Sequence, residues 1–254
     1  MDFLQGWHDY FVANSLKGSD ISWTEHAQLT GREKRCIERS IAAFQLGEYS
    51  EGKGLLRAAE LFAPEVPSEY LVRITRLFIS EEQNHAMLLG KFMTIHNIEL
   101  IKTHWADIVF RRLRKAVGFE LSITVLITAE IISLIYYQAL RASSNSTQLK
   151  QICNRILADE VKHVRYESEL IDHIRFGRSR IYRATVRLLH AFLFLGTTMV
   201  VYWSHRDVLN MGGYGLIEFH QQCWREFAAA FSPKTPANGS CGARHARRRE
   251  PRDA

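Results

Sequence analysis

The sequence EEQNH at residues 81–85 and the sequence DEVKH at residues 159–163 share the pattern Glu-x-x-His, each time preceded by a second carboxylate. On an α-helix, side chains three residues apart lie on one face, about one turn apart. The glutamate and the histidine of each copy can therefore reach a shared point. One such pair arises often by chance, whereas two copies in long helical segments indicate a common role.

Both copies lie within apolar helical stripes, which predicts that their polar groups face inward. The apolar residues that flank the two copies at helical spacing are Ile74, Phe78, Leu89 and Phe92 in the first segment and Ile152, Ile156 and Leu170 in the second. An ionised carboxylate buried without a partner is strongly unfavourable. Four groups therefore need a metal ion or strong hydrogen-bonding partners: Glu82, His85, Glu160 and His163.

The rest of the chain favours an all-α fold. It has only five prolines in 254 residues, and long stretches lack both proline and glycine. Thr30 and Glu33 form a capping box, and Ser68 and Thr147 are further candidate caps. We expect two helical hairpins joined by a crossover at 99–117, with a basic amphipathic piece from Trp105 to Leu113. The expected helices cover residues 30–62, 68–95, 118–142 and 147–176, with two additional C-terminal helices at 179–204 and 214–231.

Four regions follow from this pattern. Residues 1–29 form an N-terminal extension, 30–176 the four-helix bundle, and 177–231 a helical hairpin packed on the bundle or in a dimer interface. The tail at 232–254 carries six cations and two acidic residues, and so holds +4 of the net charge of +6. Its low apolar content predicts disorder, and the nearly neutral body argues against nucleic-acid binding.

Cysteine use and the N-terminus predict a cytoplasmic protein. The four cysteines form no CxxC pair, and no basic and apolar secretory signal begins the chain. The apolar segment 188–203 is shorter than the roughly 20 residues that span a bilayer. We therefore expect no transmembrane span, and a helix buried in the protein or in a subunit interface. Peripheral contact with a membrane is the alternative.

A metal site also requires one inward carboxylate from the first helix of each hairpin. Glu130 is the single charged residue between Leu121 and Tyr137, and it precedes Glu160 by 30 residues. In the first helix, Glu48 and Glu51 both fit the apolar stripe. Glu51 precedes Glu82 by 31 residues, against 34 for Glu48, and this spacing slightly favours Glu51. The choice stays open.

The residues just described resemble the signature of the ferritin-like di-iron carboxylate superfamily. Its members take one glutamate from each of two helices and a Glu-x-x-His from each of the other two. The resemblance covers residues 30–176, and the segment from Asp159 to Tyr166 looks like the metal-binding helix of oxygenase-type members. It implies a ferritin-like four-helix bundle that holds two iron ions, with manganese or a mixed manganese and iron pair as alternatives.

The resemblance also implies a role for each residue. Glu82 and Glu160 would bridge the metals, His85 and His163 would each bind one, and the terminal ligands would be Glu130 and either Glu51 or Glu48. Histidine ligands need an acceptor for their second nitrogen. The supporting candidates near the site are Glu81, Asp159, Tyr137 and Tyr49. No catalytic residue is assigned beyond the metal centre.

Two ferrous ions held close together can give two electrons to dioxygen. We therefore expect an oxidoreductase or oxygenase that oxidises a small apolar organic substrate, draws on an electron donor and forms a homodimer. One alternative is a ferritin-like ferroxidase for iron storage or detoxification. Another is a metal-free structural bundle whose Glu and His residues form a buried polar network. The extra C-terminal helices favour the enzyme.

Overall fold

The computed structural model describes residues 3–18, 21–23, 29–50, 52–66, 68–103 and 118–232. Within these ranges the protein is built of helices and contains no strand, which confirms the all-α prediction. The predicted amphipathic piece from Trp105 to Leu113 and nearly all of the basic tail lie outside the described residues. The helices are α1 Phe3–Ser15, α2 Gly31–Ser50, α3 Lys53–Phe62, the 3-10 turn η1 Ala63–Glu65, α4 Tyr70–Ile95, α6 Phe119–Ala142, α7 Thr147–Ile174, α8 Arg180–Met211 and α9 Leu216–Ala230.

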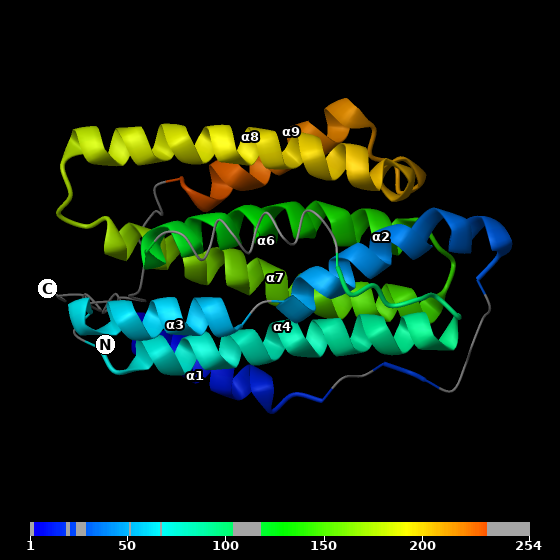
Figure 1. The fold of residues 1–254 in the computed structure, drawn as a ribbon, viewed down its shortest axis with the longest axis horizontal. Helices are drawn as coiled ribbons and strands as arrows, with labels where there is room; N and C mark the ends of the chain where they lie inside the picture. The colour runs from blue at the N-terminus through cyan, green and yellow to red at the C-terminus, as the bar shows by residue number, and fades with distance from the viewer. Residues whose placement is uncertain are drawn as a thin grey trace, which may run out of the picture.

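Four helices surround the interior that matters for function. The most extensive helix pairs are α6 with α7 and α2 with α4, and α4 also packs on α7. Figure 1 shows α8 along one side of the molecule and α1 along the opposite side, with α4, α6 and α7 between them. The two predicted hairpins are thus present as packed pairs.

The start of α2 is the capping box that the sequence predicts. The Thr30 amide donates to Glu33 Oε2 over 2.8 Å, and the Glu33 amide donates to Thr30 Oγ1 over 3.2 Å. Glu33 Oε1 accepts from the Asn145 amide over 2.8 Å, which ties this end of α2 to the loop between α6 and α7. These hydrogen bonds, led by the one from the Thr30 hydroxyl, lower the pKa of Glu33 to about 2.

The sequence predicts one continuous helix over residues 30–62, but the structure divides this segment into α2 and α3. α2 ends at Ser50 and α3 begins at Lys53, with Gly52 between them at φ +159. Glycine costs about 1 kcal/mol in a helix interior, and it reaches backbone angles that other residues avoid. A Cβ at Gly52 would stand 3.4 Å from Ile79 Cγ2, so glycine also lets the junction approach α4 closely.

The second hairpin agrees closely with the sequence. α6 spans Phe119–Ala142 and α7 spans Thr147–Ile174. The cap of α7 differs by one residue, because Ser146 and not Thr147 accepts the Leu149 amide. Most of α6 is buried, including Ile127, Ile131 and Ile135, as its nearly continuous apolar sequence requires.

The N-terminal extension contains a helix that the sequence pattern did not predict. α1 packs against α4 and buries Leu4, Trp7, Phe11 and Asn14. Phe11 stacks on the ring of His163 with centroids 6.0 Å apart. The extension is therefore part of the wall around the interior of the bundle.

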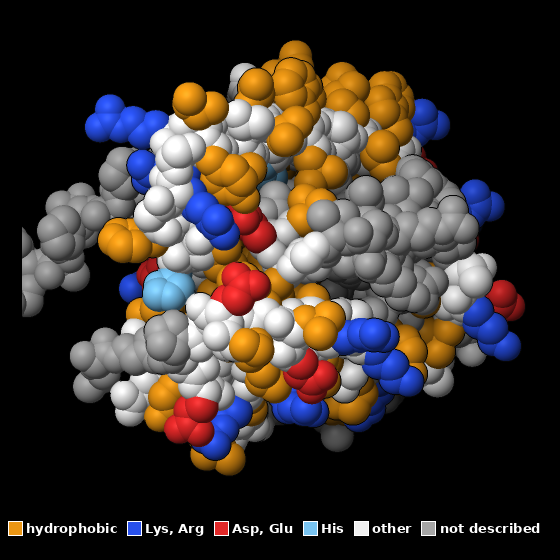
Figure 2. Space-filling model, turned by 60° about the vertical axis from the view of Figure 1, so that its left-hand side comes forward, with side chains coloured by type: hydrophobic (Ala, Val, Ile, Leu, Met, Phe, Trp, Pro, Cys, Tyr) orange, Lys and Arg blue, Asp and Glu red, His pale blue; other side chains and the backbone are white. Residues whose placement is uncertain are grey.

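The apolar segment 188–203 is not buried within the chain, contrary to one of the two expectations. It belongs to α8, which together with α6 is long and apolar enough to cross a membrane by length and composition. In α6 83% of the apolar window is buried, as in a core helix, whereas in α8 the figure is 22%. Apolar side chains gather at the top of Figure 2, where α8 lies. The helix expected at 179–204 ends earlier than α8, which continues to Met211.

Candidate metal centre

Six acidic and histidine side chains from four helices meet in the interior of the bundle. Their ligand atoms form two groups, each with all its atoms within 4.8 Å of one another. One group is Glu48, Glu82, His85 and Glu160, and the other is Glu82, Glu130, Glu160 and His163. Glu82 and Glu160 belong to both groups, so the cluster has two adjoining positions with two shared carboxylates.

The two shared carboxylates lie between the two imidazoles. Glu82 Oε1 stands 3.5 Å from His85 Nδ1 and 3.2 Å from His163 Nδ1. Glu160 directs one oxygen to each ring, with Oε1 3.4 Å from His85 Nδ1 and Oε2 3.6 Å from His163 Nδ1. All four side chains are buried. Carboxylates placed in this way can bridge two cations.

The Nε2 atom of each imidazole is hydrogen-bonded to a carboxylate on the opposite helix. His85 Nε2 on α4 donates to Asp159 Oδ2 on α7 over 3.1 Å, and His163 Nε2 on α7 donates to Glu81 Oε2 on α4 over 2.9 Å. Glu81 and Asp159 are buried, so they face the interior and not the solvent. A carboxylate that accepts from Nε2 leaves the Nδ1 lone pair free for a cation.

A third residue, which sequence reasoning missed, joins these two supports. The Asn14 side-chain amide on α1 donates to Glu81 Oε1 over 2.8 Å and to Asp159 Oδ1 over 2.9 Å. The buried positions of α1 begin with Leu4, Trp7 and Phe11, and Asn14 continues their spacing of three and four residues. A polar residue in the apolar register of the extension was therefore the available signal.

Among the described residues, the side chain that α2 contributes to the cluster is Glu48. Its Oε2 lies 3.8 Å from His85 Nδ1, and its Oε1 accepts a short hydrogen bond from the Tyr137 hydroxyl. Glu51, which the residue spacing favoured, lies outside the described residues. The other supporting candidate on this helix, Tyr49, is 67% exposed and does not join the buried cluster. Tyr137 is fully buried and supports the site from α6.

Several ligand atoms are buried without a hydrogen-bond partner among the described residues. They are Glu82 Oε1, both carboxylate oxygens of Glu160, and the Nδ1 atoms of His85 and His163. Buried polar atoms are nearly always paired in proteins, so each such atom needs an explanation. Their convergence on one volume is what a site for cations requires.

Protonation of the cluster reflects the crowding of like charges. Burial raises the pKa of Glu82 and of Glu130 well above the usual value, and the neighbouring carboxylates raise both further. Burial acts to raise the pKa of Glu160 as well, but Glu130 and the two imidazoles outweigh burial and lower it. The carboxylates therefore do not share one protonation state.

The two imidazoles have pKa values well above the usual one. Burial acts to lower the pKa of His85 and of His163, but the carboxylates around each ring outweigh burial. Without a cation, protons on these rings offset part of the negative charge. A metal ion takes over that role only after the protons leave.

The donor set suits a pair of hard or borderline metal ions. Four carboxylates and two imidazoles are ligands that suit iron or manganese, whereas structural zinc sites are typically rich in thiolates. The unpartnered Nδ1 and carboxylate oxygens fit such ions directly. The structure therefore contains buried carboxylate and histidine clusters that could hold metal ions.

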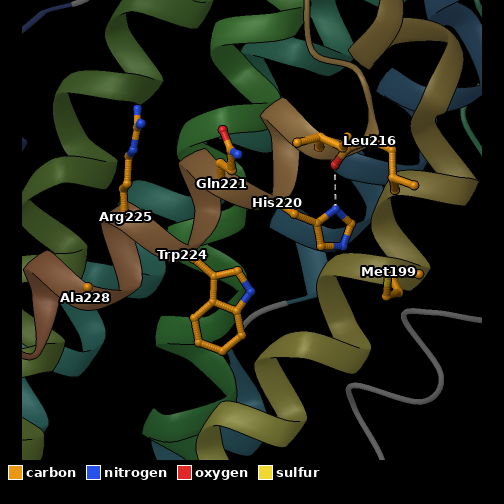
Figure 3. Close-up of a pocket in the computed structure, with 8 residues that line it drawn as sticks. Met199, Leu216, His220, Gln221, Trp224, Arg225 and Ala228 are labelled. Atoms are coloured by element: carbon orange, nitrogen blue, oxygen red, sulfur yellow. Dashed lines mark hydrogen bonds between the residues drawn. The ribbon is translucent and has the colours of Figure 1, made fainter.

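A groove on the described surface lies apart from the cluster. It encloses about 660 Å³ between α8 and α9, and most of the side chains that line it are apolar (Figure 3). His220 donates from Nδ1 to the Leu216 carbonyl over 2.8 Å, and Trp224 is another of the lining side chains (Figure 3). None of the six cluster residues lines this groove.

Comparisons of the chain with protein-family models, with curated proteins and with solved structures found no match. The described residues form an all-helical protein with buried carboxylate and histidine clusters that could bind metal.

Proposed function

We propose that this protein is a non-haem di-iron oxidoreductase of ferritin-like type, which activates dioxygen to oxidise a small apolar organic molecule. One observation carries the proposal: both imidazoles present an unpartnered Nδ1 to the same two carboxylates, while their Nε2 atoms are held from behind. This is the arrangement that histidine ligands need, and both rings have it.

In this proposal Glu82 and Glu160 would be shared by the two metals. Glu48 and His85 would complete one position, and Glu130 and His163 would complete the other. When bound, a pair of ferrous ions supplies the two electrons that dioxygen needs to react with an organic substrate. An external electron donor would restore the ferrous pair, and manganese is the alternative metal.

The protein's own residues hold and shield this centre. Asp159 and Glu81 fix the orientation and tautomer of the two rings, and Tyr137 restrains Glu48. Phe11 and Phe78 cover the His163 ring, with Phe78 centred 4.5 Å from it. An apolar wall of this kind excludes water and favours an apolar substrate.

A ferroxidase for iron storage or detoxification is the second candidate. It would use the same ligands, but it would need little beyond the four-helix core. Here α1 supplies Asn14 to the supports of the site, and α8 and α9 cover α6. These additions favour the enzyme. A metal-free bundle is the weakest candidate, because it leaves the converging ligand atoms without partners.

Metal analysis after anaerobic loading with ferrous iron tests the proposal. We expect about two irons per chain, as the ligand set of such bundles provides. Glu130→Ala should lose metal, whereas Glu69→Gln, which removes a charge that is 64% exposed at the start of α4, should keep it. Unchanged metal content in Glu130→Ala would exclude this ligand. Mineral growth far beyond two irons under excess iron and oxygen would favour storage.

A further inference from the structure

Glu167 is a buried carboxylate that the centre described above does not use. It lies on α7, its exposed fraction is 0%, and neither carboxylate oxygen has a hydrogen-bond partner among the described residues. A carboxylate in this state must hold a proton or meet a cation. Glu167 therefore needs a proton or a cation as its partner.

Its place in the helix brings it next to the metal cluster, outside the two groups whose ligand atoms lie within 4.8 Å of one another. Glu167 follows His163 by four residues, which puts both side chains on one face of α7, one turn apart. Its charge interacts with those of His163, Glu160 and Glu130, which are three residues of the same metal position. Burial raises the pKa of Glu167, the positive charge of His163 acts to lower it, and Glu160 raises it further.

This carboxylate breaks the correspondence between the two Glu-x-x-His helices. Around the motifs the helices match, since Glu81, Glu82 and His85 on α4 correspond to Asp159, Glu160 and His163 on α7. Four residues after the histidine, α4 has Leu89, which is fully buried, and α7 has Glu167. The additional negative group therefore stands on one side of the centre only.

We propose that Glu167 is an additional carboxylate ligand for the metal position formed by Glu130 and His163. This inference rests on the proposed function, because it assigns a further ligand to the same centre. It makes the two positions unequal, since one has an additional anionic ligand and the other has an apolar leucine at the matching place. The Glu130 position then binds a divalent cation more tightly and fills first.

Anaerobic titration of the metal-free full chain with cobalt(II) tests the inference by calorimetry and by the visible cobalt spectrum. The wild type should bind in two steps of different affinity. Glu167→Gln removes the charge at nearly constant shape, and Glu167→Leu introduces the residue found at the matching place on α4. Both should weaken the tighter step by about 10- to 100-fold and leave the weaker step unchanged.

Two comparisons assign the steps and check the fold. Glu48→Gln should weaken the other step, because Glu48 belongs to the group formed with Glu82, His85 and Glu160 and not to the Glu130 position. Asp172→Asn removes an exposed carboxylate from the same helix and should leave both steps unchanged. Glu167→Asp keeps the charge on a shorter side chain, so an intermediate loss of affinity separates ligand loss from a disturbed core.

The outcomes separate this inference from the proposed function. If the wild type binds two cobalt ions and both Glu167→Gln and Glu167→Leu titrate like it, Glu167 is a neutral buried acid and the inference is wrong, while the two-metal centre stands. If the wild type binds fewer than two ions, the proposed function itself fails. Loss of the weaker step in Glu167→Gln would place the carboxylate at the other position and overturn the assignment.

Discussion

His163 on α7 donates from Nε2 to Glu81 Oε2 on α4 over 2.9 Å. The converse bond runs from His85 on α4 to Asp159 on α7. Each of the two helices that carry a Glu-x-x-His motif therefore supplies the hydrogen-bond acceptor that orients the histidine of the other helix. Each motif depends on the other helix for the orientation of its histidine, so neither half of the centre is independent.

Removal of one of these supporting carboxylates should weaken metal binding. In Glu81→Ala the His163 ring loses its acceptor, so neither its tautomer nor its orientation is fixed. We expect metal affinity to fall about 10- to 100-fold, as for other residues that support metal ligands. Competition with a metal-binding dye measures it. Glu60→Ala, which removes a partly exposed carboxylate on α3, is the control, and equal affinities of the two variants would contradict the prediction.

Loss of Asn14 should affect both supports at once. Asn14→Ala leaves Glu81 Oε1 and Asp159 Oδ1 without their shared donor. Unsatisfied buried polar atoms cost about 1–3 kcal/mol, so the free energy of unfolding should fall by about that amount. Denaturant unfolding measures the change. Ser15→Ala alters an exposed hydroxyl of the same helix, and it should leave the stability nearly unchanged.

Tyr137→Phe should release Glu48 while leaving the core filled. The variant removes only the hydroxyl that donates to Glu48 Oε1. Because Glu48 is then free to rotate, we expect weaker binding of one metal and an altered optical spectrum of the loaded centre. Tyr136→Phe is the matched control, since its hydroxyl pairs with Ser40 and not with a ligand. A change of equal size in both variants would argue for a packing effect.

Metal binding should strengthen as the pH rises. The pKa values of His85, His163, Glu82 and Glu130 are all raised, and each group must lose its proton to bind metal. Calorimetry in buffers of different ionisation enthalpy should detect released protons. An affinity that is constant between about pH 6 and 8, where histidines ordinarily titrate, would contradict this.

The metal-free protein should show the converse of this pH dependence in its stability. A group with a raised pKa binds more protons in the folded than in the unfolded chain, so its contribution is lost as the pH rises through the folded pKa. Thermal unfolding of the metal-free form should therefore occur at lower temperature as the pH increases above about 6.5, the ordinary histidine value. Bound metal should remove this dependence.

The exposed face of α8 leads to a prediction about assembly. Leu188, Phe192, Leu195 and Met199 are exposed at spacings of four, three and four residues, as in a helix that packs on another helix. We expect a homodimer through this face, and Phe192→Glu should yield monomers in light scattering. Arg206→Glu changes charge on the same helix outside the apolar segment and should stay dimeric. A monomeric wild type would refute the prediction.

The parts of the site that depend on local geometry could be predicted from the residue order. The spacing of Glu82 to His85 and of Glu160 to His163 fixes each pair on one helical face, whatever the helices pack against. Glu130 was equally clear, because a lone charge in an apolar helix has no exposed face on which to lie. The all-α fold and the limits of α6 and α7 followed from the same local patterns.

The residues that meet across helices became known from the packed structure alone. Among the described residues, the member of the cluster that α2 contributes is Glu48, whereas Glu51, which the residue spacing slightly favoured, lies outside them. The contacts of Asn14 and the burial of Glu167 likewise became known only from the packing of the helices. The axial position of one helix relative to its neighbour is set by side-chain packing and by breaks such as the one at Gly52. It cannot be predicted from residue spacing along a single helix.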